Sequence, residues 1–360
     1  MNNLKIHFLN TIWSDAIILE KDNHFALVDT GSPFYYPMVK AHLEKHQITK
    51  LDFILLTHFH VDHYGNIANI MKDFNTEKLY LKHYYGLDGT TSSGYESNKE
   101  YIENEFKNYY NILDVAKLNN VEVIFFDESK VQDVDILFND ITLELYDANN
   151  LLYELYSNPT SKFYNEKRFN ENFNSIGVFI NYMDKHIFLG GDTTCSSTDI
   201  EEVKELSIKM INRIYKRHNI NRIDIYKSCH HGGGGTNTLA LCKLINPKYT
   251  IITNTARWLD TYTTYDNLRS ANKDVEILGR RGVTCVHNVN SNLKLASGYK
   301  FMYNELRDAG ANICLGTDGC ASSNNLDMLE TMKTSAMIQK AWRDDPAAMP
   351  LKEIMDMATV

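Results

Sequence analysis

Short apolar runs alternate with helical patterns along most of the chain. Residues 4–9, 15–20 and 25–31 predict strands, the last of which ends in a tight turn. A helical pattern follows at 36–46, and the apolar run 51–56 predicts a buried strand. Alternating strands and helices of this kind are typical of an α/β fold.

The middle of the chain is rich in Tyr, Asn and Phe. Its pattern predicts a helix at 96–118 and strands near 121–126 and 141–146. We interpret 80–118 and 150–172 as insertions. They could wall a substrate cleft, or they could be surface elaborations with no role in a site.

The strand and helix pattern then resumes. Residues 175–182 and 186–189 predict a hairpin, 200–218 predict a helix, and 224–227 and 249–254 predict two further strands. Several of these strands end in polar residues, and such strand ends are where α/β proteins usually carry their functional side chains.

Composition narrows the class of protein. The 360 residues are 43% hydrophobic and 23% charged, as in ordinary globular proteins. Mean hydropathy is −0.37, and no apolar run approaches the roughly 20 residues that span a bilayer. The N-terminus lacks a signal-peptide pattern, and the six cysteines include no CxxC pair, which favours reduced thiols. We therefore expect a cytoplasmic protein with no membrane segment.

The net charge of −9 disfavours non-specific binding to nucleic acid, which requires a basic surface. It is compatible with an anionic small-molecule or phosphodiester substrate, because bound metal cations would dominate the field at the site.

Four potential metal ligands occupy one short loop after the strand 51–56. They are His58, His60, Asp62 and His63. Imidazole and carboxylate together suit Zn²⁺, and the absence of thiolates argues against a structural zinc site. One short loop cannot wrap all four groups around one ion, but it can serve two adjacent ions.

Two other strand ends complete this set. Asp192 follows Gly190-Gly191 and is the candidate carboxylate that bridges two ions, and the pair His230-His231 supplies a distant imidazole. A single histidine is more often structural than functional, but three strand ends carrying such residues together favour a metal site. The other histidines are not part of such a group of potential ligands at strand ends. We interpret them as structural or surface residues: His7, His24, His42, His46, His83, His186, His218 and His287.

These motifs carry a resemblance to a known family. The chain resembles the metallo-β-lactamase superfamily over about 1–275, through Asp29-Thr30-Gly31, the run Thr57 to Asn66, Gly190-Gly191-Asp192 and His230-His231-Gly232. The His-His-Gly ending and Asn174-Ser175 look like its competence-protein (ComEC/Rec2-like) branch. Further echoes, such as Ile187-Phe-Leu-Gly-Gly-Asp, are similar to the catalytic domain of phosphorylcholine esterases. The resemblance implies an αββα sandwich.

It also implies a ligand set for two Zn²⁺ ions, or for another divalent metal. One ion would take His58, His60 and Asp192, and the other would take Asp62, His63, Asp192 and His231. Asp62 and His230 would be the catalytic residues, with His230 facing the substrate. Asp29 would orient the histidine loop from behind.

One departure from the family pattern bears on the substrate. Many members carry another histidine just before the Asp192 hairpin, where this chain has Asn174. Fewer protein ligands on the first ion favour phosphoester chemistry over β-lactam or thioester hydrolysis. The expected enzyme is a phosphodiesterase of the phosphorylcholine-esterase kind, with a hydroxide between the two ions as nucleophile. A lactone or a nucleotide phosphodiester is the alternative substrate.

Choline recognition would need aromatic side chains around a quaternary ammonium. Candidates for this substrate-binding role are Tyr84, Tyr85, Trp258 and Tyr262.

From about 276 to 360 the chain resembles a different family, and composition shifts there without a linker-like spacer. Ser291-Asn-Leu-Lys-Leu-Ala-Ser-Gly and Leu315-Gly-Thr-Asp-Gly look like the methylthioadenosine/S-adenosylhomocysteine deaminase group of the amidohydrolase superfamily. That family is a metal-bearing (β/α)₈ barrel, and only its last two βα units are matched. Asp318 matches a metal-binding Asp of the family. The family's other ligands have no counterpart, so we expect no deaminase activity from this fragment.

The chain therefore looks like a fusion of two incomplete pieces, natural or artefactual. A chimera that only binds metal is the non-enzymatic alternative. The first piece is expected to lack its closing hairpin near 275–278, and the segment 282–287 could replace the missing strand. Incomplete domains also predict exposed apolar edges.

Overall fold

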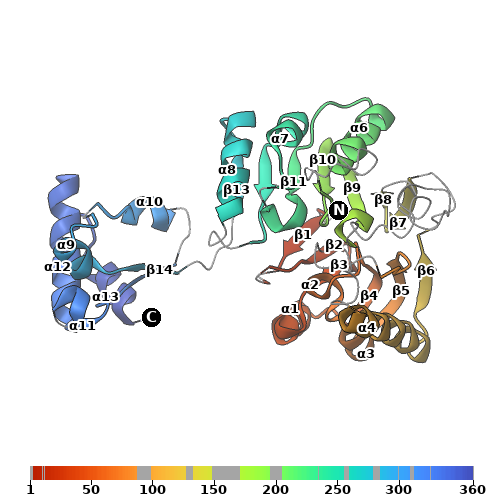
Figure 1. Ribbon diagram of the computed structural model, residues 1–360, viewed down its shortest axis with the longest axis horizontal. Helices are drawn as coiled ribbons and strands as arrows, with labels where there is room; N and C mark the ends of the chain where they lie inside the picture. Colours follow the sequence, from red (N-terminus) through yellow and green to blue (C-terminus); the bar gives the residue numbers. More distant parts are fainter. Residues whose placement is uncertain are drawn as a thin grey trace. The chain divides into compact units, whose positions relative to one another are not determined.

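The computed structural model describes residues 3–9, 11, 13–86, 99–126, 133–147, 171–194, 205–233, 235–254, 259–278, 284–298, 300–308, 312–324 and 326–359. The chain divides into two compact units, residues 1–279 and residues 280–360 (Figure 1). No helix in these described ranges has both the length and the apolar character needed to cross a bilayer.

The first sheet of the first unit has six strands in the order of the sequence. Strands β1 to β3 are antiparallel, and β3 to β6 are parallel. The strands are β1 (Lys5–Phe8), β2 (Ala16–Lys21), β3 (His24–Thr30), β4 (Lys50–Leu55), β5 (Asn75–Leu81) and β6 (Glu122–Phe125). The helices between them are α1 (Tyr36–Lys45), α2 (Val61–Tyr64), α3 (Ile67–Asp73) and α4 (Lys99–Leu118).

The second sheet has the order β13-β12-β11-β10-β9-β8-β7. Strands β7 to β10 are antiparallel, and β10 to β13 are parallel. The strands are β7 (Val134–Phe138), β8 (Ile141–Tyr146), β9 (Gly177–Tyr182), β10 (Lys185–Leu189), β11 (Ile225–Lys227), β12 (Tyr249–Ile251) and β13 (Glu276–Leu278). Helices α6 (Leu206–His218), α7 (Leu239–Ile245) and α8 (Leu259–Ala271) join the parallel strands.

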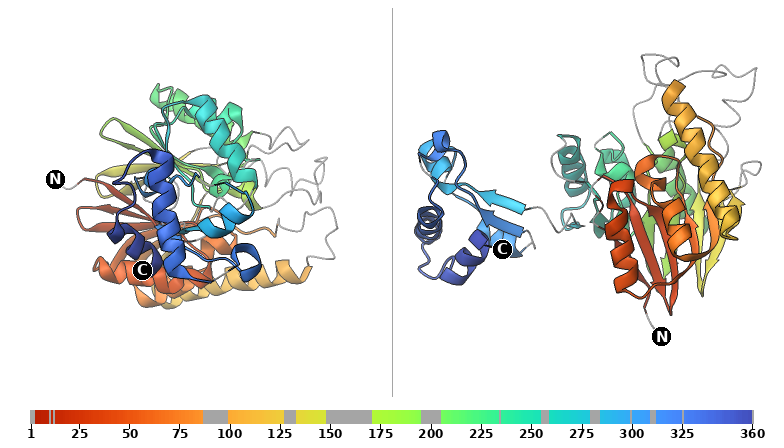
Figure 2. Two further views of the ribbon diagram at one scale, coloured as in Figure 1. Left: turned by 90° about the vertical axis from the view of Figure 1, so that its left-hand side faces the viewer. Right: turned by 90° about the horizontal axis from the view of Figure 1, so that it is seen from below.

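Three separate apolar cores show how these elements are layered. Because side chains alternate across a strand, Leu27 of β3 packs in a core with α1, α3 and α4, whereas the next residue, Val28, packs in the core between the two sheets. A third core lies between the second sheet and α6, α7 and α8, and contains Phe188. The first unit is therefore an αββα sandwich, as the sequence predicts (Figures 1 and 2).

The helix predicted at 96–118 is part of this sandwich. Tyr109, Ile112, Val115 and Ala116 of α4 are buried in the outer core of the first sheet. The interpretation of 80–118 as a cleft wall is therefore wrong for α4, whose apolar face covers the sheet. Residues 87–98 and 148–170 lie outside the described residues.

The expectation for 282–287 is also wrong. Residues 284–287 form β14 of the second unit, which pairs in parallel with β15 (Asn312–Leu315). The edge of the first unit's second sheet is instead β13, which pairs with β12 from Glu276 to Leu278. β14 and β15 form a separate two-stranded sheet, so residues 284–287 belong to the second unit.

The second unit contains these two parallel strands and five helices among the described residues. The helices are α9 (Val289–Lys294), α10 (Tyr303–Asp308), α11 (Cys320–Ser323), α12 (Met328–Arg343) and α13 (Leu351–Thr359). Each strand is followed by helix, as in a fragment of a (β/α) barrel. Its small apolar core includes Ile313 and Leu315 of β15 and Met332 of α12.

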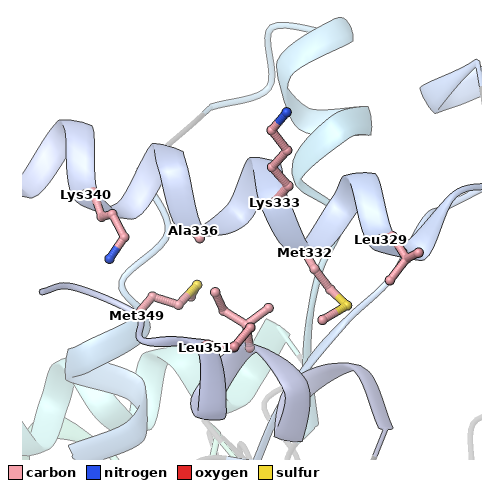
Figure 3. Close-up of a pocket in the computed structure, with 8 residues that line it drawn as sticks. Leu329, Met332, Lys333, Ala336, Lys340, Met349 and Leu351 are labelled. Atoms are coloured by element: carbon pink, nitrogen blue, oxygen red, sulfur yellow. The ribbon is translucent and has the colours of Figure 1, made fainter. Parts of the chain in front are cut away.

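The second unit has exposed apolar side chains around a cavity between two of its helices. A cavity of about 370 Å³ opens between α12 and α13 and is lined by Met332, Ala336 and Met349 among others (Figure 3). At its rim, Leu329 is 75% exposed and Leu351 is 73% exposed.

His287 at the end of β14 is buried, and its ring stacks on Phe301 with centroids 4.2 Å apart. Neither ring nitrogen has a hydrogen-bond partner among the described residues. Burial lowers the pKa of His287 to about 4, because an apolar site disfavours the charged imidazolium.

The stability of the second unit should therefore depend on pH. An unfolded histidine titrates near about 6.5, so below that pH the unfolded chain binds a proton that the folded unit excludes. The free energy of unfolding should fall as pH drops from about 6.5 towards 4. We expect hydrogen-exchange protection of β14 and β15 to decrease over this range, and to decrease less in His287→Phe. Equal pH dependence in both proteins would contradict this.

Candidate metal centre

The predicted ligands follow strands from both sheets of the first unit. The histidine loop 57–63 follows β4 of the first sheet, whereas Asp192 and the pair His230-His231 follow β10 and β11 of the second sheet. Residue Ile176 of the second layer donates its backbone N–H to the carbonyl of Thr57 at 2.9 Å. The loops of the two sheets therefore meet at one end of the sandwich.

Asp192 lies at the centre of this meeting point and is buried. Its Oδ2 lies 3.3 Å from His63 Nε2, 3.6 Å from His231 Nε2, 3.7 Å from His58 Nε2 and 3.8 Å from His230 Nε2. One carboxylate thus faces imidazoles from both sheets, which is the arrangement required of a carboxylate that bridges two cations.

The ligand atoms fall into two groups that share Asp192. One group is His58, His60 and Asp192, and the other is Asp15, His63, Asp192 and His231; within each group the ligand atoms lie within 4.8 Å of one another. Buried atoms His63 Nε2 and Asp192 Oδ1 have no hydrogen-bond partner among the residues that the structure describes. Such nitrogen and oxygen donors fit Zn²⁺ or a related divalent cation.

The second group contains Asp15 where the sequence predicts Asp62. Asp62 Oδ2 lies 3.2 Å from His231 Nε2 and 3.8 Å from His63 Nε2. These are the same two nitrogens that face Asp192. Asp15 Oδ1 instead lies 3.2 Å from Nδ1 on the other side of the His231 ring. Asp15 is therefore placed to orient His231 from behind, in the manner of a carboxylate that supports a metal-binding histidine.

Asp29 supports the histidine loop in the same way. Its Oδ2 lies 2.8 Å from His63 Nδ1, and its Oδ1 accepts the backbone N–H of Thr57 at 2.8 Å. The Thr57 hydroxyl also donates to Asp29 Oδ2 at 2.8 Å. This buried carboxylate fixes the ring of His63 so that Nε2 points at Asp192.

Asn174 lies close to the histidine loop. Its amide Nδ2 donates to Glu171 Oε1 at 3.0 Å, and the same carboxylate oxygen accepts the backbone N–H of Phe59 at 3.2 Å. Both residues are buried. Asn174 therefore acts on the backbone of the histidine loop through Glu171.

The turn that carries the histidine pair has an unusual backbone. His230 and His231 have φ values of 48° and 51°, and Gly232 has a φ of 94°. Left-handed conformations at non-glycine residues cost free energy and persist where surrounding contacts hold them. Here Asn237 Nδ2 donates to the carbonyls of Cys229 and Gly233, at 2.9 Å each.

The sequence analysis missed a buried ion pair beneath the site. Lys227 at the end of β11 is fully buried, and its ammonium donates to the Asp15 carboxylate. Asp15 also accepts the hydroxyl of Thr253 at 2.7 Å. The only signal in the sequence was a lysine directly before the Ser-Cys-His-His run, in a strand that is otherwise buried. Nothing in the sequence linked it to Asp15, which lies far earlier in the chain.

Electrostatics at the site follow from burial and from this crowding of opposite charges. Burial alone would raise the pKa of Asp192, but His231, His63 and His230 hold it well below the usual value. Burial would lower the pKa of His231, but Asp192 and Asp15 raise it to about 9. Without a cation, protonated imidazoles must therefore balance the negative charge of the buried carboxylates. A bound divalent cation would supply this positive charge in place of the protons.

Among the predicted substrate-binding aromatics, Tyr84 is not at the site. Tyr84 is buried in the outer core, where its ring lies 4.9 Å from the rings of Phe59 and Phe106. It supports the histidine loop from behind, through Phe59, and is not available to a ligand. Tyr85 is partly exposed. Trp258 and the side chain of Tyr262 lie outside the described residues.

Asp318 of the second unit is exposed and accepts the hydroxyl of Ser291 at 2.8 Å. None of the ligand groups found among the described residues includes it. The described part of the second unit therefore does not present the several ligands that a catalytic zinc requires.

Two family models match the chain. The Metallo-beta-lactamase superfamily matches residues 14–137, and the Amidohydrolase family matches residues 170–360. The chain belongs to the amidohydrolase family, whose model covers more than half of it, and its N-terminal part matches the metallo-β-lactamase superfamily. Members of both typically depend on divalent metal ions, which agrees with the two ligand groups around Asp192. The amidohydrolase match begins shortly before β9, so part of it falls on the second sheet of the sandwich.

The curated relatives match the amidohydrolase part. A 5'-deoxyadenosine deaminase of Methanococcoides burtonii is 54% identical over 87 residues, which are 24% of this chain and 20% of that protein. A 5-methylthioadenosine/S-adenosylhomocysteine deaminase of Syntrophobacter fumaroxidans is 52% identical over 87 residues, with the same coverage. The chain thus spans about one fifth of the length of the curated relatives it matches.

Solved structures with some likeness have the metallo-β-lactamase fold. The metallo-beta-lactamase fold protein YhfI from Bacillus subtilis aligns with a TM-score of 0.43 at 11% identity, covering 78% of this chain and 97% of that chain.

The buried ion pair predicts a large effect of Lys227→Met on stability. The change leaves the Asp15 carboxylate buried without its ammonium partner, which typically costs about 3–5 kcal/mol. Urea unfolding of the full chain should show this loss, whereas Lys185→Met on the exposed end of β10 should change stability by less than about 0.5 kcal/mol. A cost for Lys227→Met below about 1 kcal/mol would show that the pair does not hold the site together.

Asp29 predicts an effect on metal binding. Asp29→Asn weakens the support of His63, so we expect affinity for Zn²⁺ to fall by about 10- to 100-fold. Competition with a chromogenic chelator measures this. Asp73→Asn, a change of a carboxylate that bonds Tyr36 and Lys40 on the surface, is the control. Unchanged affinity in Asp29→Asn would exclude the positioning role.

Proposed function

We propose that the first unit, about residues 1–275, is a dinuclear zinc hydrolase that cleaves phosphoric diesters. The observation that carries this proposal is the sharing of Asp192 by two ligand groups, His58 and His60 on one side, and His63 and His231 on the other. Asp62 joins the second group in place of Asp15, which faces the back of His231. Two bound Zn²⁺ ions would supply an activated water and neutralise developing negative charge.

The ligand count favours a phosphoester over other substrates. The first group offers three His and Asp ligands, and the amide nitrogen of Asn174 donates to Glu171. Three protein ligands leave coordination positions open for water and for a phosphoryl oxygen. A metal ion with open positions could contact the phosphoryl oxygens directly, and its positive charge would then stabilise the negative charge of a phosphorane-like transition state.

His230 is the proposed residue for contact with the substrate. Its side chain is 44% exposed, which makes it more open than His58, His63 and His231, the other imidazoles around Asp192 Oδ2. The strained turn holds its Nε2 on the same side of the site as Asp192. A donor at this position would hydrogen-bond a phosphate oxygen or protonate the leaving oxygen.

Substrate identity within this class is part of the proposal. Phosphorylcholine esters are the first candidate, with Tyr85, Trp258 and Tyr262 as the aromatic side chains that would contact a quaternary ammonium. A nucleotide phosphodiester or a lactone is the second. Deamination, the reaction named for the relatives of the second unit, is not proposed, because Asp318 stands there without further ligands among the described residues.

A panel of substrates tests the proposal on the full chain loaded with Zn²⁺. We expect hydrolysis of bis-p-nitrophenyl phosphate, and faster hydrolysis of p-nitrophenylphosphorylcholine if the aromatic residues bind choline. Asp192→Ala removes the shared ligand, so turnover should fall at least about 100-fold and the zinc content should fall relative to the parent chain. His60→Ala should also lose zinc.

The matched control is Asp52→Ala, a change of a surface carboxylate that bonds His24. It should leave turnover and zinc content unchanged. Zinc binding without turnover of any ester would contradict the enzymatic proposal and leave a metal-binding chimera. Turnover of lactones alone would contradict the phosphodiester assignment.

A further inference from the structure

A second histidine cluster lies apart from the catalytic loops. It consists of His7 on β1 and of His42 and His46 at the end of α1, and none of the three belongs to the ligand groups around Asp192. The sequence analysis assigned these residues to the structural or surface histidines. The fold brings His7 to the other two, which lie 35 or more residues later in the chain.

The packing of β1 and α1 explains why the three rings meet. Ile6 and Phe8 pack against the core between the sheets, so His7, which alternates with them, faces the outer helix layer. Val39 and Leu43 of α1 are buried and fix that helix on the sheet. His42 and His46, one helical turn apart, are then held above His7.

The three rings are in mutual contact. The rings of His42 and His46 are stacked with centroids 4.4 Å apart, and His7 meets them edge-on at 5.4 Å and 5.2 Å. One potential ligand atom from each histidine lies within 4.8 Å of the others. His42 and His7 are partly buried, whereas His46 is exposed and opens the cluster to solvent.

The nitrogen spacing matches that of a metal site. His7 Nδ1 and His42 Nε2 are 3.4 Å apart. Two nitrogens bound to one tetrahedral zinc at about 2.0–2.1 Å are separated by about 3.3 Å. We propose that His7, His42 and His46 bind a divalent cation of the zinc type, in a site distinct from the catalytic one. Three imidazoles suit Zn²⁺ and leave one position for water.

A carboxylate orients His7 for this role. Glu20 Oε2 lies 2.9 Å from His7 Nε2, and Lys5 donates to the other oxygen of the same carboxylate at 2.5 Å. A hydrogen bond from Nε2–H to Glu20 leaves the lone pair on Nδ1, the nitrogen that faces His42. This is the carboxylate–histidine pairing that accompanies metal-binding imidazoles.

The charge state of His42 is also suitable. Burial, together with the neighbouring His46, His7 and Lys45, lowers the pKa of His42 to about 4. Its imidazole is therefore neutral near pH 7 and does not have to release a proton before it binds a cation.

A bound cation would tie two elements together. Among the described strands, β1 lies at the edge of its sheet and pairs with β2. A cation would cross-link this strand to α1. Binding to the folded state alone would raise the temperature of unfolding.

The test measures Zn²⁺ bound per full-length chain by equilibrium dialysis at micromolar free zinc. His42→Gln and His46→Gln should each bind one equivalent less than the parent chain and should lose part of the zinc-dependent rise in the unfolding temperature. His24→Gln, which changes a surface histidine bonded to Asp52, should behave as the parent chain. Hydrolytic activity should be the same in all four proteins.

The same difference of one equivalent is expected when the variants are made in Asp192→Ala, which separates this site from the catalytic centre. Unfolding temperatures in zinc-free buffer establish that the variants fold. Equal zinc content in His42→Gln, His46→Gln and His24→Gln would overturn the proposal and leave the cluster as a hydrogen-bonded stack of rings.

Discussion

The buried carboxylate of Asp192 is the constraint on which the candidate metal centre of the first unit depends. A carboxylate taken out of water is tolerated only when opposite charge surrounds it. The imidazoles around this carboxylate follow strands of both sheets: His58 and His63 follow the first sheet, and His230 and His231 follow the second. Both halves of the sandwich therefore stabilise the negative charge of Asp192. The relative position of the two sheets at this end is therefore fixed by electrostatics as well as by the apolar core between them. Asp29, Glu171 and Asp15 extend the same principle, since each buried carboxylate is paired with groups of the ligand loops.

Much of the fold and of the site could be predicted because the signals are local. The helix at 36–46, the hairpin at 175–189 and the histidine loop each lie within a short stretch whose pattern is sufficient. The strand β7 was missed, and Asp15, Lys227 and Glu171 were missed as parts of the site, because their roles arise only from contacts across the sheets. A single buried lysine carries no pattern that distinguishes it from a surface lysine. The assignment of 282–287 failed for a related reason: an apolar strand does not show by its own sequence which sheet it will join.

The family matches raise a physical question, because the amidohydrolase match begins within the sandwich. In the second sheet, β10 to β13 are parallel and are joined through α6, α7 and α8. These are consecutive βα units, the same local unit from which a (β/α) barrel is built. Strands buried on both faces in either architecture have similar apolar sequences, so a match across 170–279 agrees with an αββα sandwich. The second unit, by contrast, has two such units and an uncovered apolar groove between α12 and α13.

The position of β13 has a consequence for the chain that follows it. β13 is the last strand of the first unit and lies at the edge of its sheet, paired with β12 on one side. A change of sequence directly after an edge strand interrupts no hydrogen-bonded ladder and separates no pair of the candidate ligands around Asp192. The segment after β13 can therefore vary while the order of the strands and the ligand loops stay the same.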